Sequence, residues 1–247
     1  MKKFFVFLCL LITMEIHAQT VQVAAASNLR YILEDIKTKY LKMNPKSAIE
    51  ISLGASGALT QQIIHGAPFD FFMAADASFP QKLQDEGCTV GAIKTYGFGK
   101  LVLWSNTLDV SKGMNILTEK RVTRIALAKP EIAPYGKVAV QCLKFYKLYD
   151  LIKTKIIYAD NLSQAAQFAE TGNAEAAFIA YALVMGPELK NKGTYFVPET
   201  KSYEPVEQAC VLLKNSKGNP EALKFMNFIL SDACRPLFEK YGFHVPQ

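Results

Sequence analysis

The 247-residue sequence predicts an α/β fold of two lobes, each a mostly parallel sheet flanked by helices, with two strands crossing between them. First, short β-rich segments alternate with amphipathic helical segments, which is the pattern of parallel α/β sheets. Second, the alternation occurs in two series, with longer β-rich segments near 95–105 and 205–213 between them. Third, the length suits two lobes of about a hundred residues each. Two lobes joined by two crossing strands form a hinged clamp.

The first series contains three strand–helix units. The expected strands are 21–26, 48–53 and 69–75, and the expected helices are 28–43, 58–65 and a segment that Asp76 caps. Apolar residues of the first helix recur at helical spacing, and Asn44-Pro45 closes it. Gly66-Ala67-Pro68 is a strong stop signal for the second helix. The segment FDFFMAA (69–75) is apolar on both faces, as a strand buried inside a parallel sheet should be.

The second series repeats the pattern. Its expected strands are 124–128, 155–159 and 176–181. One helix is expected to begin at APYG (133–136) and to end at about residue 146. A second helix is expected at 160–173, with Gly172-Asn173 as its C-cap. The chain then returns through 207–213 to a terminal helix at 220–240. We therefore expect lobe one to comprise 19–101 plus 212–247, and lobe two to comprise 102–211.

Residues 1–18 have the pattern of a secretory signal peptide. Lys2-Lys3 precedes the short apolar run FFVFLCLLITM, and a small residue, Ala18, marks the expected cleavage site. The run is too short for an ordinary membrane span, so an uncleaved anchor is the less favoured alternative. Leu8 precedes Cys9 where a lipoprotein signal needs a small residue, so we expect no lipid anchor. The sequence predicts a periplasmic protein.

Charge and cysteine content exclude several classes of protein. Loss of two lysines and one glutamate with the signal lowers the formal charge from +6 to +5. The basic residues are scattered, without the clustering of a nucleic-acid-binding surface. Cys88, Cys142, Cys210 and Cys234 remain, and they could form two disulfides or stay free. No spacing of cysteine or histidine indicates a metal site.

Strand-to-helix turns hold the candidate binding residues, because ligands of open α/β sheets bind where strands end and helices begin. The candidates are the side chains of Ser27, Asn28, Ser56 and Tyr135, and the turn at Asp160-Asn161-Leu162. Helix N-termini there offer unpaired N–H groups, and no turn carries Lys or Arg, so a neutral cage of donors for a small oxyanion is expected. The alternative is that each Ser or Asn is only a helix cap.

Gly54-Ala55-Ser56-Gly57-Ala58 also resembles the elbow that presents a catalytic serine. An elbow serine needs a downstream histidine as base, and after the signal only His65 and His244 are present. His65 lies about 13 Å along the following helix, and His244 lies in the C-terminal tail. An exported serine hydrolase using Ser56 is therefore a distant alternative. We interpret Gly54 and Gly57 as small residues that let the backbone approach an anion.

Five segments together resemble the periplasmic molybdate-binding proteins of ABC-type importers. They are VAAASNL, GASGALTQQIIHGAPFDFFMAAD, PEIAPYGKVAVQCL, DNLSQAAQFAETGNAEAAFIA and FEKYGF, which follow that order over essentially the whole mature chain. The resemblance implies a periplasmic-binding-protein-like clamp that holds molybdate or tungstate with Ser27, Asn28, Ser56, Tyr135 and the backbone N–H of Leu162. Leu162 stands where the family often has valine, and a main-chain donor makes this change nearly neutral. Ala180 occupies the place of a tyrosine that some members use, and we leave Tyr181 out of the site.

The resemblance further implies a monomeric solute-binding protein that delivers its oxyanion to the membrane permease of an ABC importer. It implies no enzymatic activity, no cofactor, no metal ligated directly by side chains and no nucleic-acid partner. The nearer alternative is the same clamp with another small oxyanion, such as sulfate or phosphate. The sequence does not display the cage dimensions that would decide between these anions.

Overall fold

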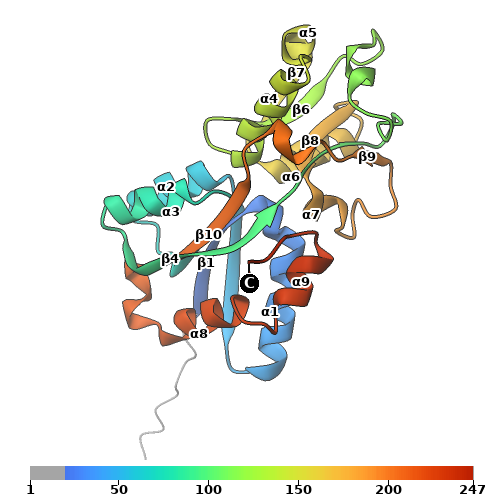
Figure 1. Cartoon of the computed structure of the whole chain (residues 1–247). Helices are drawn as coiled ribbons and strands as arrows, with labels where there is room; N and C mark the ends of the chain where they lie inside the picture. The colour runs from blue at the N-terminus through green and yellow to red at the C-terminus, as the bar shows by residue number, and fades with distance from the viewer. Residues whose placement is uncertain (1–19, 247) are drawn as a thin grey trace, which may run out of the picture.

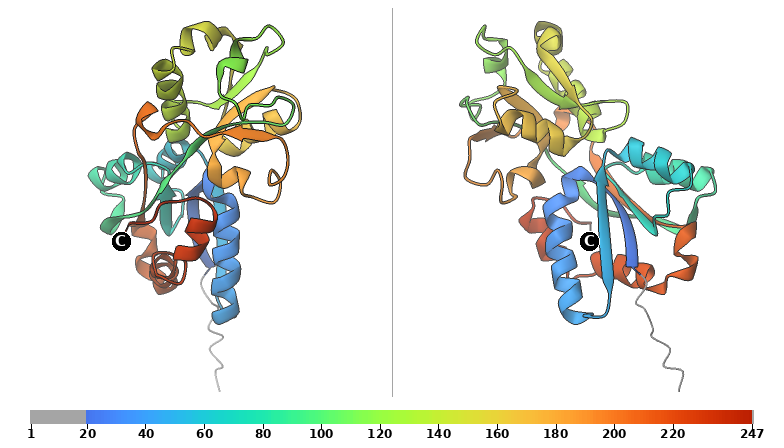
Figure 2. Two further views of the ribbon diagram at one scale, coloured as in Figure 1. Left: turned by 45° about the vertical axis from the view of Figure 1, so that its right-hand side comes forward. Right: turned by 180° about the vertical axis from the view of Figure 1, so that it is seen from behind.

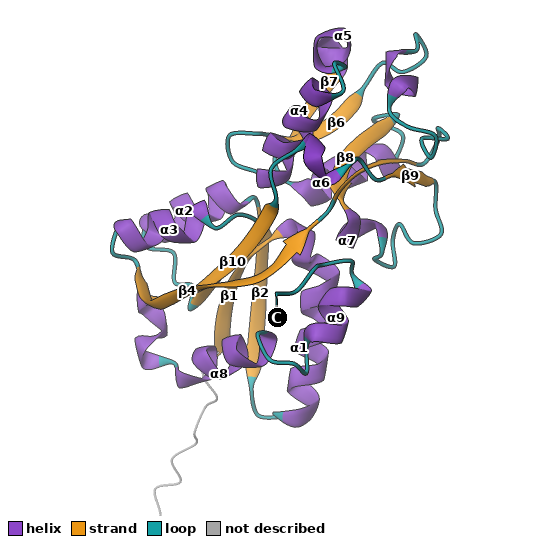
Figure 3. Ribbon diagram, in the orientation of Figure 1, coloured by secondary structure: helices purple, strands orange, loops and turns teal. Residues whose placement is uncertain are grey.

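A computed structural model describes residues 20–246, so the expected signal peptide (1–18) lies outside the described residues. The chain folds into two lobes, each with a five-stranded mixed sheet flanked by helices (Figures 1 and 3). The predicted α/β class and two-lobed arrangement are confirmed. Each sheet has three adjacent parallel strands, then one strand that runs antiparallel to them, and an edge strand that is antiparallel to this fourth strand.

The first lobe contains the sheet β2-β1-β3-β10-β4. Its strands are β1 (Thr20–Ala26), β2 (Ala48–Gly54), β3 (Phe71–Ala74), β4 (Thr89–Gly99) and β10 (Val206–Leu213). Its longer helices are α1 (Arg30–Met43), α2 (Ser56–Ile64), α3 (Ser78–Asp85), α8 (Pro220–Ile229) and α9 (Arg235–Lys240). In β3, Phe71 and Met73 pack into a core with α1 and α8, whereas Phe72 and Ala74 pack against α2 and α3. Helices thus cover both faces of this strand, as its continuous apolar sequence predicts.

The second lobe contains the sheet β7-β6-β8-β5-β9. Its strands are β5 (Leu101–Ser105), β6 (Ile125–Ala128), β7 (Ile156–Ala159), β8 (Ala176–Ala180) and β9 (Thr194–Phe196). Its α-helices are α4 (Pro134–Phe145), α5 (Tyr149–Ile152), α6 (Leu162–Glu170) and α7 (Tyr181–Val184). The three strands expected in this series form its parallel part, and Gly172 follows α6 with a positive φ of 77°, as expected beyond a helix C-terminus.

Two chain segments cross between the lobes (Figure 2). The first crossing is short, because β4 ends at Gly99 and β5 begins at Leu101. The second lies between β9 and β10. All of β10 belongs to the first sheet, where it pairs with β3 and β4, so residues 206–211 lie there and not in the second lobe where the sequence analysis put them.

The C-terminal segment differs from the single helix expected at 220–240. It forms α8 and α9, separated by residues 230–234. Pro236 lies in the first turn of α9, where its missing N–H costs nothing, whereas in a continuous helix it would remove a hydrogen bond and clash with the preceding turn. The expected cap is also shifted: Asp76 Oδ1 accepts from Ser78 N–H at 2.7 Å, but the residue that precedes α3 is Ala77.

Cys88, Cys142, Cys210 and Cys234 are all free thiols, which decides between the two alternatives for these residues. Burial raises the pKa of Cys142 to about 11 and that of Cys210 to about 12. Within residues 20–246, no helix is long and apolar enough to cross a membrane. The same residues contain no group of three His, Cys, Asp or Glu side chains that could hold a metal ion.

Candidate functional site

One small cavity between the lobes is lined by residues of five strand-to-helix turns. Its lining residues are Ala26, Ser27, Asn28, Gly54, Ala55, Ser56, Ala75, Ala133, Pro134, Tyr135 and Leu162. All five candidates from the sequence, Ser27, Asn28, Ser56, Tyr135 and Leu162, are therefore together. They come from segments up to 135 residues apart, as the pair Ser27 and Leu162 shows. The cavity measures only ≈ 10 Å³, far less than the pockets that hold drug-sized ligands, so it excludes a ligand of that size.

The three hydroxyl groups of this cavity are set to donate. Each hydroxyl oxygen already accepts a hydrogen bond from the protein. The bonds are Leu162 N–H to Ser27 Oγ at 3.1 Å, Ala75 N–H to Ser56 Oγ at 3.0 Å, and Gln208 Nε2–H to Tyr135 Oη at 3.0 Å. A hydroxyl carries one hydrogen and accepts through its lone pairs, so an oxygen that accepts in this way keeps its hydrogen free for another acceptor. The site thus offers hydrogen-bond donors to a ligand.

The alternative that each Ser or Asn is only a helix cap holds for the turn at Asn161 and fails for the turns at Ser27 and Ser56. Asn161 is a helix cap, because its side chain accepts from Gln164 N–H at 3.1 Å. Ser27 and Ser56 make no such bond at the starts of their helices, and both side chains are almost fully buried. Their hydroxyls are used across the cavity and not within the first turn of a helix.

No lining side chain of this cavity carries a charge. Tyr135 is 2% exposed, and its burial raises its pKa well above the usual range of tyrosine, so the phenol remains a neutral donor. Asn28 is also buried; its Nδ2 donates to Gln208 Oε1 at 2.9 Å, whereas its Oδ1 has no partner among the described residues. The unpaired atom is an acceptor, so a donor such as water would satisfy it, whereas an oxyanion, which only accepts, would bond to the Nδ2 side of the amide.

The nucleophile interpretation of Ser56 lacks its base. Within the described part of the chain, no histidine forms a hydrogen bond with Ser56. His65 is exposed just beyond the last residue of α2, and the backbone of His244 pairs with Phe98. An elbow serine needs a base within hydrogen-bond reach, so the geometry does not support a hydrolase.

Gly57 lies at a close contact between the two lobes. Its N–H donates to Ile132 O of the second lobe at 2.8 Å, and a Cβ at Gly57 would lie 2.9 Å from Ile132 Cα. The space beside Gly54 is filled by the side chain of Leu59. These glycines therefore allow close packing of protein against protein, which differs from the approach to an anion that the sequence analysis proposed.

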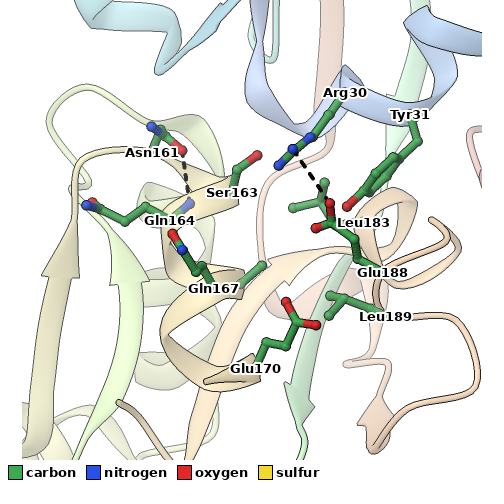
Figure 4. A pocket seen from close by; sticks show the side chains of 11 residues that line it. Arg30, Tyr31, Asn161, Ser163, Gln164, Gln167, Glu170, Leu183, Glu188 and Leu189 are labelled. Atoms are coloured by element: carbon green, nitrogen blue, oxygen red, sulfur yellow. Dashed lines mark hydrogen bonds and ion pairs between the residues drawn. The ribbon is translucent and has the colours of Figure 1, made fainter. Parts of the chain in front are cut away.

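A second, larger cavity of ≈ 550 Å³ opens between α1 and α6 next to the first (Figure 4). Here Arg30 of the first lobe forms an ion pair of 3.6 Å with Glu188 of the second, and Glu170 also lines the cavity. This outer cavity holds two carboxylates and one guanidinium, so its net negative charge disfavours the binding of an anion. Tyr181 lines neither cavity; its ring stacks edge-on against Tyr195 at 5.5 Å.

Sequence reasoning did not identify Gln208, Tyr96 or Ala75 as parts of this site. Gln208 lies in the apolar strand EQACVLL, and a buried polar residue in such a strand is the only signal in the sequence that could have indicated it.

A family model described as "Bacterial extracellular solute-binding protein" matches residues 21–244. The chain is 35% identical over 228 residues to the "Molybdate-binding protein ModA" of Azotobacter vinelandii, covering 92% of this chain and 90% of that protein. It is 35% identical over 196 residues to the protein of the same name from Rhodobacter capsulatus, covering 79% and 77%.

The solved structure of the periplasmic molybdate-binding protein of Azotobacter vinelandii superimposes with a TM-score of 0.86 at 31% identity. The match covers 92% of this chain and all of that chain. The two lobes and the cavity between them thus lie within the shared fold.

Proposed function

Because the chain belongs to the family of bacterial extracellular solute-binding proteins, we propose that it captures molybdate in the cavity between its lobes and delivers it to an ABC permease. The resemblance noted in the sequence motifs agrees with this family. The observation that carries the proposal is the set of three hydroxyls in the cavity: each oxygen accepts a hydrogen bond from the protein, which leaves its hydrogen for a ligand, and no lining side chain is charged.

A fully ionised tetrahedral oxyanion is the ligand that such a cavity suits. Its oxygens only accept, and each hydrogen bond to a charged acceptor is worth about 1.5–3 kcal/mol. Several such bonds, aimed from both lobes into one small cavity, support tight binding without a counter-charge. The ligand oxygens would bond to Ser27, Asn28, Ser56, Tyr135 and the N–H of Leu162. Tungstate has the same charge and shape, and we propose that it binds in the same way.

Phosphate and sulfate test the limits of the proposal. Near neutral pH phosphate carries a proton that needs an acceptor, whereas the hydroxyls of this cavity face it as donors. Sulfate is also fully ionised, so only the size of the closed cage separates it from molybdate. A binding site discriminates between two anions when one of them leaves hydrogen-bond donors of the site unpaired or too distant. An anion smaller than molybdate would leave some of these donors without a bond.

The same proposal covers location and partners. The pattern of residues 1–18 supports export to the periplasm, where a monomer would meet its anion and then the permease. No covalent step and no cofactor are needed, because the protein only binds and releases its cargo. Within residues 20–246 no histidine bonds to Ser56, so nothing there favours the hydrolase alternative.

Thermal unfolding of the mature protein tests the proposal. A ligand bound only by the folded state stabilises it by about 2.7 kcal/mol at a hundredfold excess over Kd. For a chain of this size that is a rise in Tm of about 5–10 °C. We expect this rise with molybdate and tungstate and a much smaller one with sulfate or phosphate. No rise with molybdate would contradict the proposal, and an equal rise with sulfate would assign the clamp to oxyanions in general.

A further inference from the structure

Gln208 lies where the two lobes and the hinge meet. It belongs to β10, the strand that receives the second crossing segment, and its side chain is fully buried. Gly99 ends β4 at the other crossing. A Cβ at Gly99 would overlap both Tyr135 Oη and Gln208 Nε2, so the hinge backbone forms one wall around this pair.

The Gln208 amide has partners at both of its ends. Its Oε1 accepts from Asn28 Nδ2 at 2.9 Å and lies 2.9 Å from Tyr96 Oη, which is equally close to Ala74 O. Its Nε2 donates to Tyr135 Oη at 3.0 Å. Asn28 comes from the first lobe and Tyr135 from the second, so one buried amide connects two proposed ligand donors across the interlobe boundary.

The direction of these bonds determines what the ligand meets. Oε1 of Gln208 accepts from Asn28 Nδ2, and Nε2 of Gln208 faces Tyr135 Oη and donates to it. The Tyr135 oxygen then accepts, and its only hydrogen remains for a ligand. A buried side-chain network with all of these partners is worth more than its separate bonds, because each member orients the next.

We infer that Gln208 is a positioning residue that orients the Tyr135 hydroxyl and the Asn28 amide toward the oxyanion, and so sets the affinity of the site without touching the ligand. This inference rests on the proposed function. A purely structural Gln208 would also stabilise the fold, so the test must separate orientation from stability.

Isothermal titration with molybdate on three variants makes this separation. Gln208→Met keeps the volume but removes both bonds, and we expect binding about tenfold weaker or more, as for loss of one hydrogen bond to a charged acceptor. Glu207→Gln on the same strand is the matched control, because Glu207 points the other way and bonds to Thr95. It should bind as the wild type does. Thermal unfolding without ligand records any change in stability separately.

Gln208→Glu tests whether a change of charge and hydrogen-bond direction at this position reaches the ligand. An ionised carboxylate accepts from the Tyr135 hydroxyl, turns its hydrogen away from the cavity and repels the anion. A protonated carboxyl donates to Tyr135 and accepts from Asn28, as the amide does. Burial raises the pKa of such a carboxyl, so affinity should rise as the pH falls from about 8.5 to about 6, while the wild type stays constant. A weak affinity that does not change with pH would contradict the orienting role.

A double-mutant cycle with Tyr135→Phe completes the test. If Gln208 acts partly through the Tyr135 hydroxyl, Gln208→Met must cost less in the Tyr135→Phe background than in the wild type. Fully additive losses, or wild-type affinity in Gln208→Met, would overturn the inference. Failure of the wild-type protein to bind molybdate would instead overturn the proposed function, so the two failures are distinguishable.

Discussion

The backbone N–H of Leu162 lies 3.1 Å from Ser27 Oγ, so a main-chain donor of the second lobe meets a hydroxyl of the first. Both groups face the same small cavity. An oxyanion placed there would accept from both, and the bond between them would be replaced by two bonds to a charged acceptor. The ligand would then stabilise the closed arrangement because it binds that arrangement better than an open one.

Ser56→Ala should weaken molybdate binding by about 1.5–3 kcal/mol, which is roughly tenfold to a hundredfold, because one donor to the anion is lost. Titration calorimetry measures this change. Ser52→Ala, at an exposed serine of β2, is the control and should bind normally. Unchanged affinity in Ser56→Ala would remove this residue from the site, and loss of an esterase activity would support the elbow interpretation instead.

Gly57→Ala should weaken binding by about tenfold or more while leaving the unliganded protein as stable as before. The added methyl group would lie 2.9 Å from Ile132 Cα and push the lobes apart, whereas alanine itself is favoured within a helix. Calorimetry and thermal unfolding measure the two effects. Gly218→Ala is the control, because nothing lies within 4 Å of that position. Tight binding by Gly57→Ala would show that this lobe contact is dispensable.

Glu188→Gln, which breaks the ion pair with Arg30 in the outer cavity, should change molybdate affinity less than about fivefold. Both side chains are about half exposed, and exposed pairs contribute about 0–1 kcal/mol. The small effect should vanish at high salt. Loss of binding comparable to that of Ser56→Ala would instead place the anion in the outer cavity.

Molybdate affinity should stay constant between about pH 7 and about pH 9.5, because no lining group titrates in this window. Burial raises the pKa of Tyr135, so its phenol keeps the hydrogen that it donates. The unfolded chain loses this proton near pH 10 while the folded chain keeps it, so folding stability falls as the pH rises beyond that value. Titrations across this range measure affinity. A loss of affinity near neutral pH would indicate a titrating ligand group, such as a histidine.

Much of the fold follows from local sequence patterns. The strand FDFFMAA is buried on both faces as predicted, and the alternation of strands and helices is present in both lobes. The break between α8 and α9 was missed because apolar spacing continues across it, although Pro236 was visible as a signal. Local sequence patterns thus predict the presence of a helix or strand better than the residues at which it begins and ends.

The candidate site was predictable only in part. Helix starts after strands indicated Ser27, Ser56 and Tyr135 as candidates, but a cap such as Asn161 has the same local sequence as a ligand donor. What separates them is a partner from a distant segment: Ala75 N–H for Ser56, and Gln208 for Tyr135. Such pairings depend on the tertiary fold, and a single sequence does not contain them as a pattern.

A crystal structure of the molybdate complex, with an anomalous difference map at the molybdenum absorption edge, tests the central claim most directly. We expect one strong peak between the lobes, with ligand oxygens within about 3.2 Å of Ser27 Oγ, Ser56 Oγ, Tyr135 Oη and Leu162 N. A peak beside a lysine or arginine side chain, such as Arg30 in the outer cavity, or no peak in the interlobe cavity would contradict it.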